Sequence, residues 1–113
     1  MEFSVKNLDD VVVLHVDATS LGGPGAHQMS NKIRSFMDQG ISKFIVDMEK
    51  VEWMNSSGLG IVIGALHTVT SRNGRLCLIN ISEKTEQLLK ITKLERVFSI
   101  FNSEEEAVAD FSE

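Results

Sequence analysis

A chain of 113 residues, 42% of them hydrophobic, is long enough for one domain with a core of moderate size and leaves no room for a second. We therefore treat residues 1–113 as one domain. The 16 acidic and 11 basic side chains give a net charge of −5, and no cluster of lysine and arginine interleaved with aromatic residues occurs. This balance argues against nucleic acid as a partner, because a phosphate backbone binds to basic surfaces.

No apolar run reaches the roughly 18 residues that a membrane span requires, and the first residues lack the basic-then-apolar order of a signal peptide. We expect a cytoplasmic protein without membrane insertion. Cys77, the single cysteine, lies within the apolar run 76–79. A disulfide within the chain and a zinc site of several thiolates are thereby excluded, and a buried structural thiol is expected.

The first half of the chain predicts two strands, a helix and a third strand. Residues 2–6 and 11–16 have the composition of strands around a turn at residues 7–10, and the second run is almost unbroken in its apolar character. Such a run is typical of a strand with both faces covered. Apolar residues spaced three and four apart predict a helix over 29–37, and the apolar run 43–48 follows as a strand.

The second half continues the alternation. Apolar residues three and four apart, beginning at Leu59, predict a central helix that ends near residues 72–74. The runs 75–81 and 97–101 predict the next two strands, with a helix capped by Ser82 between them.

A last helix is expected after these strands, because Ser103 and Glu106 form an S-x-x-E capping box. The alternation of elements predicts an α/β fold, with a mixed, mainly parallel sheet of four to five strands packed against about four helices.

The segment that opens the central helix is Asn55-Ser56-Ser57-Gly58-Leu59-Gly60. The first turn of a helix has unpaired N–H groups and the positive end of the helix dipole, so a serine hydroxyl can cap it and a phosphoryl group is favoured there. Capping alone would also account for the two serines. The residues themselves leave both interpretations open.

A second face of the central helix is small and apolar where a surface helix would carry charges. Its residues are Gly60, Ile61, Gly64, Ala65 and Thr68. Either a neighbouring helix of the same domain covers this face, or a partner protein docks on it. Trp53 and Met54 would add apolar anchors to such a docking surface, although Trp53 could equally fill the core.

No active site is expected. His15, His27 and His67 fall on three different predicted elements and have no evident partner, and His27 and His67 have no acidic or cysteine neighbour at metal-ligand spacing. We therefore expect a protein that is not an enzyme and that holds no metal or cofactor.

One segment, Ser-Ser-Gly-Leu-Gly, follows an apolar strand and the polar-aromatic loop 51–54. This arrangement resembles the STAS domain, and most closely the anti-sigma-factor antagonists. The signature of that family is Asp-Ser-Ser-Gly-Leu-Gly, and five of its six residues stand in order within 55–60. Asn55 replaces the aspartate, and residues 16–21 lack the Gly-x-Leu-Asp segment that is frequent in the family. The predicted order of elements agrees with the family over nearly the whole chain.

The resemblance implies a partner switch. The unmodified domain would bind an anti-sigma factor that is also a serine kinase, and so release a sigma factor. Ser57 is the implied phosphoacceptor, ATP would belong to the kinase, and a phosphatase would reset the switch. The implied partner-binding residues are Trp53, Met54, Asn55, Ser56, Ser57, Gly58, Leu59, Ile61, Ala65 and Thr68.

A second function fits the same fold. The chain is also similar to small STAS interaction subunits of lipid-transport ABC complexes, or to a scaffold subunit of a stress-signalling assembly. Such a subunit would use the same helix face without a phosphate cycle.

Overall fold

The computed structural model describes residues 3–22 and 26–112. In chain order its elements are β1 (Phe3–Leu8), β2 (Val11–Val16), β3 (Ser20–Leu21), α1 (Ala26–Asp38), β4 (Lys43–Asp47), β5 (Trp53–Met54), α2 (Ser56–Thr70), β6 (Arg75–Ile79), α3 (Glu83–Ile91), β7 (Ser99–Phe101) and α4 (Glu104–Phe111). The main sheet has five strands in the order β1-β2-β4-β6-β7, in which β1 is antiparallel to β2 and the other neighbours are parallel. The predicted α/β fold with a mixed, mainly parallel sheet is confirmed.

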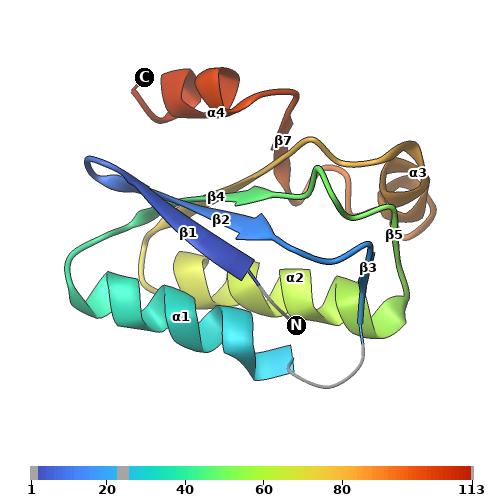
Figure 1. Ribbon diagram of the computed structural model, residues 1–113, viewed down its shortest axis with the longest axis horizontal. Helices are drawn as coiled ribbons and strands as arrows, with labels where there is room; N and C mark the ends of the chain where they lie inside the picture. Colours follow the sequence, from blue (N-terminus) through green and yellow to red (C-terminus); the bar gives the residue numbers. More distant parts are fainter. Residues whose placement is uncertain (1–2, 23–25, 113) are drawn as a thin grey trace.

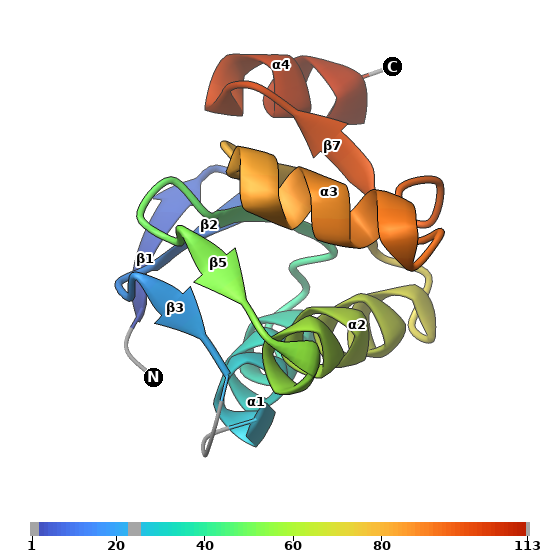
Figure 2. The same ribbon diagram turned by 90° about the vertical axis from the view of Figure 1, so that its right-hand side faces the viewer.

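The helices lie on both sides of this sheet. Helices α1 and α2 pack together beneath one face, and α4 covers part of the other face (Figure 1). Helix α3 lies with the short strands β3 and β5 at the end of the sheet where the parallel strands finish (Figure 2). The loop that leaves β4 at this end of the sheet leads through β5 to the start of α2.

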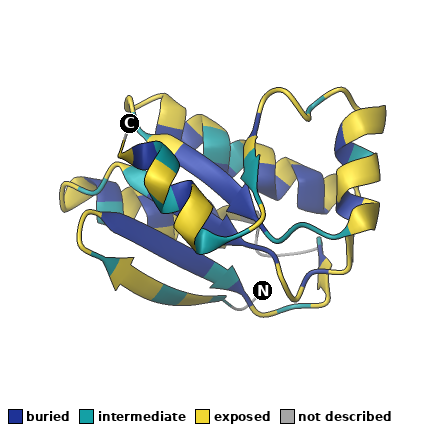
Figure 3. Cartoon of the chain, turned by 90° about the horizontal axis from the view of Figure 1, so that it is seen from above, coloured by how far each residue is buried: buried dark blue, intermediate teal, exposed yellow. Residues whose placement is uncertain are grey.

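The inner strands β2 and β4 are buried on both faces, as their apolar runs predict. Alternate side chains of β2 and β4 enter a large core shared with α1 and α2, and the others enter a smaller core under α4. The smaller core contains Val11, Val13, Ile45, Cys77, Ile79, Ala107 and Phe111. The edge strand β1 alternates between exposed and half-buried residues, and the contrast with the buried β2 is visible in Figure 3.

Strand boundaries differ from the predicted ones where single residues adopt the left-handed conformation. The first strand runs on to Leu8, because the turn is confined to Asp9 and Asp10, with Asp9 at φ 57°. The predicted strand 75–81 ends earlier, because Asn80 also has φ 57°. Short polar side chains tolerate this conformation, so the strands stop there without glycine. The predicted start of the first strand at residue 2 lies outside the described residues.

A second, two-stranded sheet was not predicted. Strands β3 and β5 pair in parallel, with Ser20 opposite Trp53 and Leu21 opposite Met54. Two residues per strand are too few to produce a periodic signal in the sequence. This β3–β5 ribbon joins the loop after β2 to the loop after β4, just before α2 begins.

Candidate functional site

The start of α2 is capped by Asn55. This residue is extended, with φ −93° and ψ −174°, and its Oδ1 accepts a hydrogen bond from the N–H of Gly58 at 2.9 Å. The interpretation in which a serine caps the helix is wrong, because Ser56 and Ser57 are the first two helical residues. Asparagine and serine are comparable caps, so local preference alone does not select between them.

The first turn of α2 is pressed against the end of β3. A Cβ on Gly58 would lie 2.0 Å from the carbonyl oxygen of Leu21, so no larger residue fits. The Asn55 N–H also donates to that carbonyl oxygen, at 3.4 Å. Gly22, with φ 154°, makes a similar approach, since a Cβ there would lie 2.4 Å from the Asn55 Oδ1. The β3–β5 ribbon therefore supports the helix start from behind.

The outer side of this helix start is exposed. Asn55, Ser56 and Ser57 are exposed, as is Trp53 with 46% of its surface accessible. The helix geometry continues this exposed stripe along the residues three and four further on. We call the exposed set Trp53, Ser56, Ser57, Gly60 and Ile63 the helix-start surface. Ile63, 39% exposed, was not predicted as part of the site.

Three residues expected on a docking surface are instead buried. Ile61, Ala65 and Thr68 face the domain interior, where α2 packs against α1. A Cβ on Gly64, which lies on the same side of the helix, would be 3.8 Å from the Ser30 Oγ of α1. Gly64 and Ala65, which are small, thus allow two helices of the same domain to approach closely. The structure corrects the expected docking surface at these three positions.

Three further expected residues support the surface from beneath. Met54, Gly58 and Leu59 are buried, and Met54 and Leu59 belong to the large core. Trp53 does not fill the core, which resolves the alternative left open by the sequence. Of the ten expected residues, those on the outside are Trp53, Asn55, Ser56 and Ser57.

The electrostatics of the helix start favour an added anion. No acidic side chain lies in the first turn of α2, so its own residues do not offset the positive end of the helix dipole. A phosphoryl group on a first-turn serine would lie close to this positive end. The helix dipole therefore favours a negative charge at the first turn of α2.

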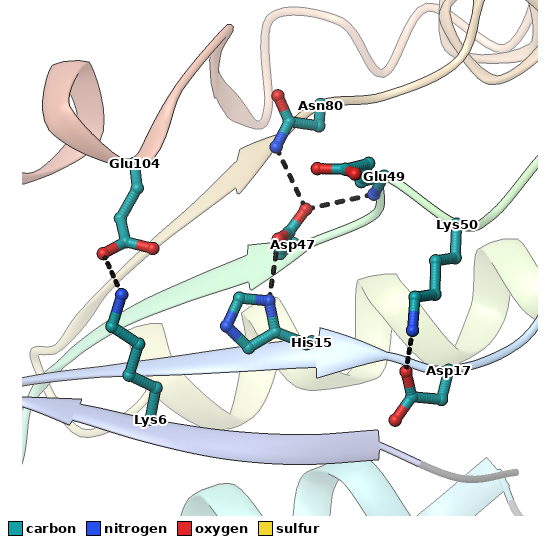
Figure 4. Close-up of polar contacts among 8 residues, drawn as sticks. All are labelled: Lys6, His15, Asp17, Asp47, Glu49, Lys50, Asn80 and Glu104. Carbon is teal, nitrogen blue, oxygen red and sulfur yellow. Dashed lines mark hydrogen bonds and ion pairs between the residues drawn. The ribbon is translucent and has the colours of Figure 1, made fainter.

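A polar cluster lies at the same end of the sheet (Figure 4). The Nδ1–H of His15 donates to Oδ2 of Asp47 at 2.7 Å, and Oδ1 of Asp47 accepts from Nδ2 of Asn80 at 3.1 Å and from the N–H of Glu49 at 3.0 Å. The expectation that His15 has no partner is wrong. Its partner is 32 residues away and reaches it through the parallel register of β2 and β4, in which His15 lies opposite Asp47.

An open pocket of about 260 Å³ lies beside this cluster. It is lined by Ser4, His15, Val16, Asp17, Asp47, Glu49 and Lys50. Within residues 3–22 and 26–112, no group of three or more histidine, cysteine, aspartate or glutamate residues is arranged to hold a metal ion. His27 and His67 are exposed and lie on α1 and α2, away from the cluster.

Cys77 is buried in the smaller core, as expected. Burial, together with the negative charge of Asp110, raises the pKa of its thiol to about 11, although the nearby Arg75 opposes the shift. A thiol in this state is a packing group and a poor nucleophile. In the part of the chain that the structure describes, no helix is both long and apolar enough to span a bilayer.

The mixed sheet, its flanking helices and the exposed serines at the start of α2 belong to one small α/β domain. The family model of the STAS domain matches residues 2–107, and the chain belongs to this family. The resemblance inferred from residues 55–60 is thereby confirmed.

Several relatives are named anti-sigma factor antagonists. The chain is 29% identical over 109 residues to a Thermotoga maritima protein assigned to that group, with 96% of each chain covered. A crystal structure assigned to the same group and organism matches with a TM-score of 0.85 and 28% identity, over 98% of this chain and 95% of that one. The anti-sigma-B factor antagonist of Listeria monocytogenes is 34% identical over 61 residues, which are 54% of each protein.

One similar structure represents a modified protein. The Bacillus cell fate determinant SpoIIAA in its phosphorylated form matches with a TM-score of 0.72 and 25% identity, covering 97% of this chain and 99% of that one.

Proposed function

We propose that this chain is an anti-sigma factor antagonist controlled by phosphorylation of Ser57. In the unmodified state it binds an anti-sigma factor with serine kinase activity and so releases a sigma factor. The kinase then transfers a phosphoryl group from its own ATP to Ser57, and a phosphatase restores the active form. The observation that carries this proposal is the exposure of Ser57 in the first turn of α2, beside the exposed Trp53.

The names of the relatives support the proposal. Anti-sigma factor antagonists are similar to the chain over nearly its whole length, and one of the similar structures is a phosphorylated form. Of the Ser-Ser-Gly-Leu-Gly segment that carries the resemblance, Ser56, Ser57 and Gly60 belong to the helix-start surface.

Phosphorylation at this position changes binding and leaves the fold intact. A phosphoserine carries about −1.5 to −2 charges at neutral pH, and the helix dipole stabilises this charge at the start of a helix. The helix-start surface itself is uncharged, with the apolar Trp53 and Ile63 as its largest side chains. A partner surface complementary to it would be repelled by the new charge.

The partner contacts are assigned by exposure. Trp53 and Ile63 are the apolar anchors, since large half-exposed side chains contribute most to binding at interfaces. Asn55, Ser56 and Ser57 supply polar contacts between them. The buried Met54, Gly58 and Leu59 act indirectly, by holding the outer residues in place.

The experiment uses four baits in a pull-down from native extract: the wild-type chain, Ser57→Ala, Ser57→Asp and Trp53→Ala. Partners and phosphate on Ser57 are identified by mass spectrometry, and the kinase found is purified and incubated with the chain and ATP. Wild type and Ser57→Ala should retain the kinase, whereas Ser57→Asp and Trp53→Ala should lose it. Ile91→Ala is the matched control, because Ile91 is 79% exposed but lies at the far end of α3.

A different result would favour a constitutive interaction subunit. If every Ser57 variant retains the same partner without kinase activity, and Ser57 carries no phosphate, the proposed switch is wrong. The partner would then be expected to be a transporter ATPase or a signalling scaffold.

A further inference from the structure

The Asp47 cluster lies where three segments of chain leave the sheet. His15 precedes the end of β2 by one residue, Asp47 ends β4, and Asn80 follows the end of β6. The carboxylate of Asp47 accepts one hydrogen bond from each of these side chains and a third from the backbone N–H of Glu49 (Figure 4). We call this set of four residues the Asp47 hub.

The same three segments meet again a few residues later. The N–H of Glu52 donates to the carbonyl oxygen of Thr19 at 2.7 Å, and the carbonyl oxygen of Glu52 accepts from the Ser82 Oγ at 2.8 Å. Thr19 follows His15 by four residues, and Ser82 follows Asn80 by two. The backbone of Glu52 is therefore a second junction, directly before Trp53 and the helix-start surface.

A third link joins the loops between the hub and the junction. The Lys50 Nζ lies 2.9 Å from the Asp17 Oδ1, which ties the loop after β4 to the loop after β2. Ser82 also caps α3, since its hydroxyl accepts from the N–H of Thr85 at 3.1 Å. Residues 49–52 are thus held at both ends, by the hub and by the junction, against two neighbouring segments.

Burying the carboxylate of Asp47 costs free energy, and filling space in the core does not explain why a charged residue stands there. Among the buried residues that the structure describes, Asp47 is the one with a charged side chain, and an ionised carboxylate loses hydration on burial. Its three hydrogen bonds offset that loss. Each donor belongs to one of the segments that leave this end of the sheet, so the bonds direct the path of the loop after β4. An apolar residue would fill the same space without directing the loop.

We propose that Asp47 is a positioning residue for the Ser57 site. By holding the Glu49 N–H against the ends of β2 and β6, it sets the path of residues 49–55 and hence the orientation of Trp53, Asn55 and the first turn of α2. The role of this geometry in phosphorylation of Ser57 rests on the proposed function. The positioning itself is a property of the isolated chain and is measured without a partner.

The test compares Asp47→Asn and Asn80→Gly with wild type by amide hydrogen exchange. Asn80→Gly removes the amide donor and keeps the left-handed backbone, which glycine adopts freely, so it tests the hub even if Asp47→Asn fails to fold. Both variants should speed exchange of the Glu49, Glu52 and Gly58 amides by about tenfold through local opening. Amides in the centre of β2 should keep their wild-type rates.

The matched control is Asp110→Asn, which removes another carboxylate paired across elements, the one 2.6 Å from the Arg75 Nη2. It should leave the amides of Glu49, Glu52 and Gly58 unchanged. If the hub variants exchange no faster there than this control, or faster uniformly across the whole chain, Asp47 has only a general structural role and the proposal is overturned.

A functional readout follows once the kinase is purified. Asp47→Asn should lower kcat/KM for Ser57 phosphorylation about fivefold, while Asp110→Asn leaves it unchanged, and equal values for the two variants would contradict the positioning role. Absence of Ser57 phosphate in the wild-type chain would overturn the proposed function instead. The exchange comparison would still decide whether Asp47 positions the segment.

Discussion

The side-chain oxygen of Asn55 accepts the hydrogen bond of the Gly58 N–H at 2.9 Å, and this contact defines where α2 begins. It leaves Ser56 and Ser57 inside the first turn and on the outside of the molecule. The cap and the proposed phosphoacceptor are therefore different residues, and each can be altered separately.

Replacing Asn55 by alanine should lower the free energy of unfolding by about 1 kcal/mol, because the Gly58 N–H loses its acceptor. The free energy of unfolding of Asn55→Asp should stay within a few tenths of a kcal/mol of wild type. The aspartate carboxylate caps a helix as well as asparagine does, and its charge interacts favourably with the positive end of the helix dipole. Denaturant unfolding measures both values. The control is Ser103→Ala, which removes the cap of α4, where Oγ accepts from the Glu106 N–H. It should lower stability similarly without affecting partner binding, and wild-type stability of Asn55→Ala would show that the cap contributes nothing.

Two glycines in the first turns of α2 should respond to alanine in opposite directions. Gly58→Ala places a methyl group against the Leu21 carbonyl and should destabilise the fold by about 3 kcal/mol. At Gly60 a Cβ meets no atom within 4 Å, so Gly60→Ala should stabilise by about 0.5–1 kcal/mol through the better helix propensity of alanine. Thermal unfolding of the two variants compares them directly. Equal changes in stability for the two variants would mean that β3 does not pack tightly against the first turn of α2.

A negative charge at residue 57 should leave the fold stable. Ser57→Asp should raise the free energy of unfolding by about 0.5 kcal/mol relative to Ser57→Asn, because the charge lies at the positive end of the dipole. Thr70 lies at the other end of α2, where the dipole is negative. The free energy of unfolding of Thr70→Asp should therefore be lower than that of Thr70→Asn by about the same amount.

Both differences should shrink in 1 M salt, where the Debye length falls to about 3 Å. A large loss of stability in Ser57→Asp would indicate that phosphorylation acts by unfolding the helix start, contrary to the proposed mechanism.

The thiol of Cys77 should be unreactive in the native state at neutral pH. Burial raises its pKa to about 11 from a value of 9.0 for an unperturbed thiol, so the unfolded chain releases the proton at lower pH than the folded chain does. The corresponding contribution to stability is fully present below pH 9 and decreases as the pH rises toward 11.

Cys77→Ala has no titrating group at this position, so its stability is the reference for wild type. The stability of wild type relative to this variant should fall between pH 9 and 11 in denaturant titrations. Labelling by a disulfide reagent at pH 8 should require unfolding. Rapid native-state labelling would show that the side chain is accessible.

The order of helices and strands was predictable because each long element carries a local pattern. The apolar run of β2 and the helical spacing from Leu59 onward depend on neighbours a few residues apart, which the sequence displays directly. The same reasoning missed the β3–β5 ribbon, which has two residues per strand, and it misplaced the strand ends at Asp9 and Asn80, where single left-handed residues end the pairing.

The candidate site was predictable at its centre and not at its margins. The serines at the start of α2 were located from the motif, whereas Ile61, Ala65 and Thr68 were compatible with either a helix of the same domain or a partner. Whether such a face is covered depends on where α1 packs. No local pattern records that choice.

The sequence by itself determined the α/β alternation, the buried central strands and the serine-bearing helix start, since all three follow from periodicity and composition over short windows. The tertiary structure decided that Asn55 is the cap, that Trp53 and Ile63 face outward, and that His15 meets Asp47. These outcomes depend on the register between strands and on contacts between residues tens of positions apart. Such contacts form only when the whole chain packs together.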